Sequence, residues 1–175
     1  MTLLALVDHL QRQAADQVAF YPLETLRRAI DGGFVDVAFE NGEPCGYLWH
    51  GPYRSGRDAV IYQAVIHYDL RRRRHGAGLV AGIIEGAGRV GASGVRCRCR
   101  SGQDANEFWR ELGFACIAVI HGTTRRRTDI NVWRSPIRAG FWDGLTTAPS
   151  DQAADRSGYD RDRRAGVAFA SRWAR

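Results

Sequence analysis

The sequence predicts an α/β protein whose mixed, mostly antiparallel central sheet is flanked by helices. Segments with the 3.6-residue spacing of amphipathic helices alternate with short runs rich in β-branched and aromatic residues. An Asn41-Gly42 dipeptide separates two of these runs, as is typical of an antiparallel hairpin. With 175 residues, 45% of them hydrophobic, the chain can bury one sizeable core.

Two helices are expected before the first strand. Thr2 can cap the first helix, and the second is expected to start at Pro22 and end at Gly32 and Gly33. Strands are then expected over residues 34–40, 45–50 and 59–67. The third run is almost continuously apolar, which predicts a central strand covered on both faces.

The second half of the chain alternates helices and strands. An amphipathic helix is predicted from the glycines at 76 and 78 to Gly88, and residues 95–100 then alternate between apolar and arginine side chains, which favours a strand. A short helix over 105–112, a strand over 114–120 and a final strand over 129–133 follow. Gly, Asp, Arg and Ser dominate later, so we expect one domain over residues 1–134 and a flexible extension over 135–175.

The charge is distributed unevenly. The net charge is +6, and all 25 basic residues are arginine. Residues 1–70 contain five arginines and nine acidic residues, whereas residues 71–134 contain 13 arginines and five acidic residues. A polyanionic ligand is therefore expected on the second half, either a phosphate-rich cofactor or nucleic acid.

Other classes of protein are disfavoured. No apolar run approaches the length of a membrane span and no signal peptide is evident, so we expect a cytoplasmic protein without a membrane partner, monomeric or homodimeric. The spacing of Cys45, Cys97, Cys99 and Cys116 is not that of zinc ligands, so reduced thiols and no metal are expected.

The segment that carries chemistry lies between the third strand and the long helix. Glycines there let backbone N–H groups approach an anion, and the helix N-terminus adds partial positive charge, which suits a pyrophosphate. The residues expected to bind it are Arg73, Arg74, His75, Gly76, Ala77, Gly78 and Leu79.

This segment resembles the phosphate loop of the GNAT family of acyl-CoA-dependent N-acyltransferases. That family has a Q/R-x-x-G-x-G/A loop, and Arg73, Gly76 and Gly78 stand at its three defined positions. Residues 106–114 resemble the family's second signature, a short helix that ends in Gly-Phe. The resemblance spans residues 3–134 and implies the GNAT fold, acetyl-CoA as cofactor, and further cofactor contacts from Asn106, Trp109 and the main chain of Val65 and Ile66.

The chain departs from the family pattern in three places. It has no room for the usual strand before the first helix, and Tyr68 stands where a proline often begins the loop. Trp109 replaces the tyrosine that often serves as general acid, and an indole cannot protonate a thiolate.

The candidate general bases are chosen by position and titration range. His67 and His50 end neighbouring predicted strands and titrate near neutral pH as a residue type, while Tyr53, Tyr68 and Glu107 are further candidates. For any single one of these residues, a structural or solvated role is the alternative and the commoner one.

Three functions remain open from the sequence. The first is acetyl transfer from acetyl-CoA to an amine of unknown identity. The second is modification of adenine in DNA, since phage Mom proteins are similar in fold, size and basicity. His50 and Tyr53 would then be the functional pair. The residues expected to contact DNA are Arg71, Arg72, Arg125, Arg126 and Arg127. The third is a non-catalytic domain that binds CoA or nucleic acid.

Overall fold

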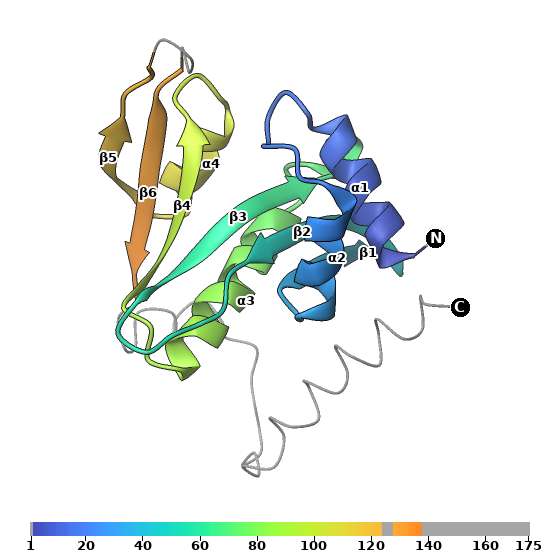
Figure 1. Cartoon of the computed structure of the whole chain (residues 1–175), viewed down its shortest axis with the longest axis horizontal. Coiled ribbons are helices and arrows are strands. Elements are labelled where there is room, and N and C mark those ends of the chain that lie inside the picture. The colour runs from blue at the N-terminus through green and yellow to red at the C-terminus, as the bar shows by residue number, and fades with distance from the viewer. Residues whose placement is uncertain (1, 124–127, 138–175) are drawn as a thin grey trace.

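The computed structural model describes residues 2–123 and 128–137 (Figure 1). The strands are β1 (Val35–Glu40), β2 (Glu43–His50), β3 (Asp58–Ile66), β4 (Gly94–Arg100), β5 (Ala115–Ile120) and β6 (Ile130–Pro136). The helices are α1 (Leu3–Gln13), α2 (Leu23–Asp31), α3 (His75–Arg89) and α4 (Ala105–Glu111), with a 3-10 turn η1 (Tyr68–Leu70).

The strands form one sheet in the order β1-β2-β3-β4-β6-β5. Only β3 and β4 run parallel, which confirms the predicted mixed and mostly antiparallel sheet. Asn41 and Gly42 join β1 to β2 with positive φ angles of 53° and 84°, the conformation expected for a tight hairpin turn.

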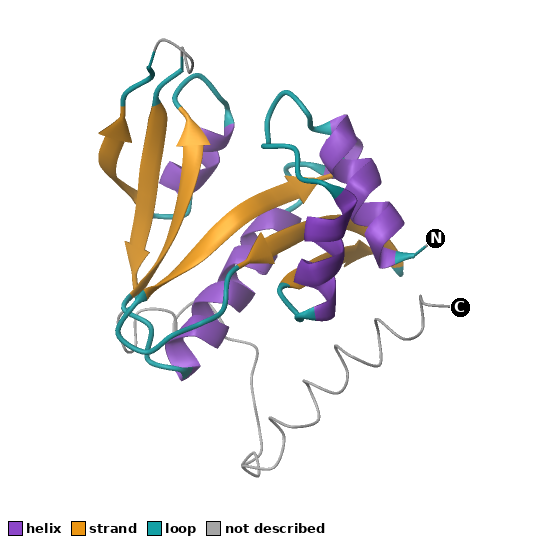
Figure 2. Ribbon diagram, viewed as in Figure 1, coloured by secondary structure: helices purple, strands orange, loops and turns teal. Residues whose placement is uncertain are grey.

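Helices cover the sheet from both sides (Figure 2). The side chain of Thr2 accepts a hydrogen bond from Ala5 N–H at 3.2 Å and caps α1, as expected. The apolar faces of α1 and α2 pack against one face of the central strands in a cluster that contains Leu6, Val7, Leu10, Leu26, Tyr47, Trp49 and Val65.

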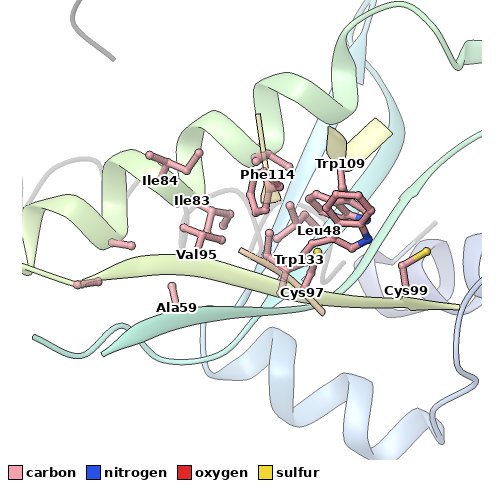
Figure 3. Close-up of a cluster of buried hydrophobic side chains, with 14 residues drawn as sticks. Leu48, Ala59, Ile83, Ile84, Val95, Cys97, Cys99, Trp109, Phe114 and Trp133 are labelled. Carbon is pink, nitrogen blue, oxygen red and sulfur yellow. The ribbon is translucent and has the colours of Figure 1, made fainter. Parts of the chain in front are cut away.

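The opposite face of the sheet carries α3 and α4. Their buried side chains share a second cluster with one face of β3, β4 and β6, and Figure 3 shows it. It contains Ile83 and Ile84 from α3, Trp109 from α4, and Cys97 and Cys99 from β4. The alternation of β4 is thus confirmed, with cysteines inward and arginines exposed; all four cysteines of the chain are free thiols.

The two parallel strands pair only at one end. Their ladder runs from Asp58 opposite Gly94 to Ile61 opposite Cys97 and then stops (Figure 1). At that point Tyr62 is an extra residue in the ladder with β2, because Gln63 is opposite Trp49 whereas Ile61 is opposite His50. This bulge bends β3 away from β4, and we call the resulting separation beyond Ile61 and Cys97 the splay.

The predicted boundaries need small corrections. β2 starts at Glu43 and β6 continues to Pro136, two residues beyond the predicted domain end at 134. Residues 138–175, most of the predicted extension, and residues 124–127 lie outside the described residues. Across residues 2–123 and 128–137, every helix is too short or too polar to span a bilayer.

Candidate functional site

The phosphate loop enters α3 through an unusual backbone path. Arg72 and Arg74 both have positive φ angles, 64° and 68°, although neither is glycine. Such conformations cost of order 1–3 kcal/mol each and concentrate at ligand-binding segments. A change from left-handed backbone at Arg74 to helical backbone at His75 is typical of turns whose successive amides form concave sites for anions.

The first turn of α3 presents open backbone donors. Gly78 N–H donates to Arg74 O at 2.9 Å, so the N–H groups of His75, Gly76 and Ala77 precede the first hydrogen bond of the helix. Leu79 is half-buried against the core and anchors this turn. The arrangement predicted from the glycines, a loop that leads to a helix N-terminus, is therefore present.

The two glycines of the loop have different surroundings. A Cβ at Gly76 would lie 3.2 and 3.3 Å from the Phe108 ring and 3.7 Å from Ile66. A Cβ at Gly78 would meet no atom within 4 Å. Gly76 thus lets α3 pack closely on α4 and on the end of β3, whereas the position of Gly78 has room for a methyl group.

Acidic and basic side chains meet beside the loop. Arg73 Nη1 lies 2.7 Å from Glu40 Oε1, and His75 Nε2 lies 3.6 Å from Glu40 Oε2. The hydrogen bond from Arg73 holds the pKa of Glu40 below its usual range. Glu40 Oε2 and His75 Nε2 are buried without a hydrogen-bond partner in the described part of the chain. Glu40 therefore ties the β1–β2 hairpin to the phosphate loop.

A pocket opens beside the loop between β1 and α3. It has a volume of about 520 Å³, and its lining includes Asp36, Tyr53, Arg73, Arg74 and Gly78. Burial raises the pKa of Asp36. Arg73 and Arg74 of the loop thus border this pocket.

The splayed half of β3 offers main-chain groups along one edge. His67 N–H donates to Cys45 O at 2.8 Å, and Val65 is opposite Tyr47 in the same ladder. Since hydrogen-bonding residues alternate in an antiparallel pair, the main chain of Val65 faces β2 and that of Ile66 faces the splay. Of the two residues expected to contact a cofactor through the main chain, only Ile66 is so oriented.

Trp109 is part of the core. It is 5% exposed, and its ring centroid lies 5.0 Å from that of Phe108 and 5.2 Å from that of Phe114. Phe108 in turn contacts the start of α3 next to Gly76. The family signature at the end of α4 therefore fixes an aromatic cluster beside the phosphate loop.

Asn106 has no hydrogen-bonding capacity left for a cofactor. Its Oδ1 accepts from Trp133 Nε1 and Asn131 Nδ2, both at 2.9 Å. Its Nδ2 donates to the carbonyls of Arg100, Ser101 and Gln103 at 2.6, 3.2 and 2.8 Å. An amide has two N–H bonds and two lone pairs on its oxygen, so these contacts saturate it. Asn106 joins β4, α4 and β6, in contrast with the cofactor contact expected from the resemblance.

His67 lies at the open end of the splay. Its side chain is 35% exposed, and its Nδ1 is buried without a hydrogen bond within the described segments, 3.8 Å from Asp69 Oδ2. Tyr68 is 75% exposed, and the Arg71 guanidinium lies 5.3 Å from its ring centroid. Glu107 is exposed in the first turn of α4.

His50 and Tyr53 belong to a different cluster. Their rings stack at 4.7 Å, while His50 Nδ1 lies 2.8 Å from Gly51 O and His50 Nε2 lies 3.5 Å from Asp36 Oδ2. His50 lies five positions along β2 from Cys45, the residue opposite His67, so the two histidines are about 17 Å apart along the sheet. The structure does not bring the two predicted bases together.

The arginines expected to contact DNA have mixed environments. Arg71 donates to Gln17 Oε1 at 2.9 Å and to Ile66 O at 3.3 Å, so it braces the loop. Arg72 is exposed. Arg125, Arg126 and Arg127 lie outside the described residues.

The connection between α1 and α2 bridges the splay. Gln63 Nε2 on β3 donates to Ala19 O, and Gln103 Nε2, beyond β4, donates to Asp16 O at 2.9 Å. Tyr47 Oη donates to Gln63 Oε1 at 3.0 Å and orients that glutamine. The splay divides the sheet into two limbs, β1-β2-β3 and β4-β6-β5. The α1–α2 connection is thus hydrogen-bonded to both limbs.

A family model identifies the family of the chain. The model of the acetyltransferase (GNAT) family matches residues 3–114. A comparison with curated proteins finds no significant match.

Solved structures share the fold at low sequence identity. Ard1 from Thermoplasma volcanium is 15% identical with a TM-score of 0.67, and the match covers 77% of this chain and 91% of that chain. Ribosomal-protein-alanine N-acetyltransferase from Brucella melitensis is 20% identical with a TM-score of 0.60, covering 76% and 93%. A putative acetyltransferase from Salmonella typhimurium, solved with acetyl-CoA, is 18% identical with a TM-score of 0.60, covering 87% and 92%.

Proposed function

Because the chain belongs to the acetyltransferase (GNAT) family, we propose that it transfers the acetyl group of acetyl-CoA directly to an amine. The observation that carries the proposal is the juxtaposition of the phosphate loop with the splay between β3 and β4. Ile66 borders both, since its main chain faces the splay and its side chain lies near Gly76.

The phosphate loop suits the pyrophosphate of acetyl-CoA. The N–H groups of His75, Gly76 and Ala77 are open donors at a helix N-terminus, where the helix dipole favours an anion. Arg74 is exposed beside them, and Arg73 is held at the loop by Glu40. Related structures have been solved with acetyl-CoA or coenzyme A, which supports this assignment.

The edge of β3 suits the thioester end of the same molecule. Ile66 N–H points into the splay and can donate to a carbonyl oxygen, which stabilises the negative charge that develops there during acyl transfer. Acetyl-CoA supplies the activated acyl group; the new C–N bond forms as the C–S bond breaks.

His67 is the proposed general base. An amine must lose a proton as it attacks, and imidazole is the side chain best suited to accept one near neutral pH. The half-exposed ring of His67 and its unpartnered Nδ1 at the open end of the splay support this role. His50 is too distant, and its two ring nitrogens already have polar neighbours.

Trp109 leaves the departing thiolate without a protein acid. A thiol has an ordinary pKa of about 8.5, so its thiolate can leave unprotonated and take a proton from water. We therefore propose direct transfer in which Trp109 packs the site and donates no proton. Catalysis then depends on positioning and on the base.

Two measurements test the proposal. Native mass spectrometry should detect a complex with acetyl-CoA, and a thiol-release assay with a panel of small amines and peptides should detect acetyl-CoA consumption that depends on the amine. Binding without transfer to any amine would favour a non-catalytic CoA-binding domain. Absence of binding would refute the assignment of the phosphate loop.

A further inference from the structure

A row of three arginines lies along the uncovered face of β4. Arg96, Arg98 and Arg100 are exposed, whereas Val95, Cys97 and Cys99 between them are buried. Alternate residues of a strand point to the same face, so the three guanidinium groups share one side of the sheet. We call these three residues the arginine row.

No helix packs over this part of the sheet within the described ranges. Figure 1 shows α1 and α2 in front of β2 and β3, while α3 and α4 lie behind the sheet. The limb formed by β4, β6 and β5 therefore presents its front face to solvent. Arg134, Val132 and Ile130 of β6 are opposite the arginine row and share this face, where Val132 is buried and the other two are partly exposed.

Carboxylates neutralise little of the positive charge of the row: Asp58 interacts with Arg96 through its charge, but its hydrogen bonds go to Arg134 and Ser93. Arg134 forms a bidentate ion pair with Asp58, with both distances 2.9 Å. By contrast, Arg96 and Arg98 form no ion pair with any residue that the structure describes, and Arg100 only approaches Asp16 O at 3.5 Å. Three cations thus remain available to a ligand from solvent.

The row leads directly to the splay. The pairing of β3 with β4 ends at Cys97, so Arg98 and Arg100 flank the region where the strands have separated. Arg100 is also next to the α1–α2 connection, through its contact with Asp16. A ligand that lies on the arginine row therefore has one end at the splay, where the proposed acyl transfer takes place.

We propose that the acceptor is an acidic peptide: its α-amino group enters the splay and its carboxylates bind Arg96, Arg98 and Arg100. This proposal rests on the proposed acetyl transfer. An extended peptide repeats its side chains on one face every 6.6–6.8 Å or so, which is about the spacing along the row because both chains are extended. Arginine also binds carboxylates in a planar, bidentate geometry.

The chemistry of the acceptor favours a peptide over nucleic acid. An α-amino group has a pKa of about 7.7–8.0, so a substantial fraction is neutral and nucleophilic near neutral pH. The exocyclic amines of nucleobases share their lone pair with the ring and are weak nucleophiles toward a thioester. A nucleic acid could bind the same cations through its phosphates, and the experiment separates the two.

The test uses two peptides of equal length with the same free N-terminal residue. One carries aspartate at alternate positions and the other carries glutamine there. We compare kcat/KM for the two peptides in the wild type, in the Arg96→Gln/Arg98→Gln double variant and in Arg27→Gln, which removes one charge at an exposed site on α2. Since Arg96 and Arg98 are exposed, the double variant should fold, which circular dichroism and its melting temperature would verify.

The wild type should prefer the acidic peptide by about tenfold at low salt, the combined effect of a few exposed charge pairs. The preference should shrink toward one in the double variant and at high salt, and remain in Arg27→Gln. Equal rates for both peptides in the wild type, or an unchanged preference in the double variant, would overturn the proposal that the acceptor is an acidic peptide. Acetylation of either peptide or of a small amine would still uphold the proposed function.

A second arm examines nucleic acid with a single-stranded oligonucleotide. Binding that is lost in the double variant, together with no preference between the peptides, would assign the arginine row to nucleic acid and overturn the proposal. Failure to bind acetyl-CoA and to acetylate any amine would instead refute the proposed function. The two failures are therefore distinguishable.

Discussion

Gly76 is the loop residue at which an added side chain has the clearest structural consequence. In Gly76→Asp, the new Cβ would lie 3.2–3.3 Å from the tip of the Phe108 ring, which must move by a few tenths of an ångström. The carboxylate would stand in the first turn of α3, where the helix dipole stabilises an anion by about 0.3–1 kcal/mol. These effects oppose one another, so we expect the unliganded variant to be within about 1 kcal/mol of the wild type.

Ligand binding should respond far more strongly. A unit charge about 5 Å from a phosphate charge costs about 3 kcal/mol at an effective dielectric constant of about 20, which weakens binding about 100-fold. At a concentration 100 times its dissociation constant, acetyl-CoA should stabilise the wild type by about 2.7 kcal/mol. That corresponds to a rise in melting temperature of about 5–10 °C, whereas the variant should gain only about 1 °C.

Differential scanning fluorimetry with and without acetyl-CoA measures both quantities. Gly78→Ala is the matched control, because its methyl group meets no atom within 4 Å and the family motif accepts alanine there. It should gain up to about 1 kcal/mol in stability from helix propensity and keep the full acetyl-CoA shift. A wild-type shift retained in Gly76→Asp would refute the assignment of the anion site to this turn.

Three further predictions concern Asn106 of α4, Asp58 at the paired end of β3, and His67 beyond the end of β3. Asn106→Ala should lower the free energy of unfolding by about 3 kcal/mol or more, measured in urea, because Trp133 Nε1 and several carbonyls lose their partner. Asp58→Asn should cost about 1.5–3 kcal/mol at neutral pH. Since Arg134 lowers the pKa of Asp58, the contribution of this ion pair to the free energy of unfolding is present above about pH 4 and is lost as pH falls through the pKa of Asp58 in the folded state. A difference in the free energy of unfolding between wild type and variant that persists unchanged at pH 3 would contradict this. His67→Gln should reduce kcat by about 100-fold and remove the acidic limb of its pH profile while the acetyl-CoA shift remains; an unchanged pH profile would exclude His67 as the base.

Local patterns in the sequence were sufficient to predict most elements of the fold. The helical spacing of the first residues, the Asn41-Gly42 turn and the alternation around Cys97 each depend on neighbours in the chain, and each is present in the structure. The loop that leads into α3 was also predictable, because it is built from consecutive residues, whereas its binding of an anion stays a prediction.

The sequence was less informative where a function depends on contacts between distant segments. The saturation of Asn106 requires Asn131 and Trp133 of β6, and nothing near Asn106 in the sequence indicates them. The choice between Val65 and Ile66 depends on the register with β2, which the bulge at Tyr62 changes. His50 and His67 looked equivalent as strand ends, but antiparallel pairing places them at opposite ends of the β2–β3 ladder.

The α1–α2 connection determines how the two limbs of the sheet can move. Because Ala19 is fastened to β3 and Asp16 to the turn after β4, widening the splay would break hydrogen bonds on one side or the other. The gap between the limbs is therefore set before any ligand arrives, and little conformational entropy remains to be lost on binding. The protein should therefore select ligands that fit a splay of fixed width, without closure of the two limbs around them.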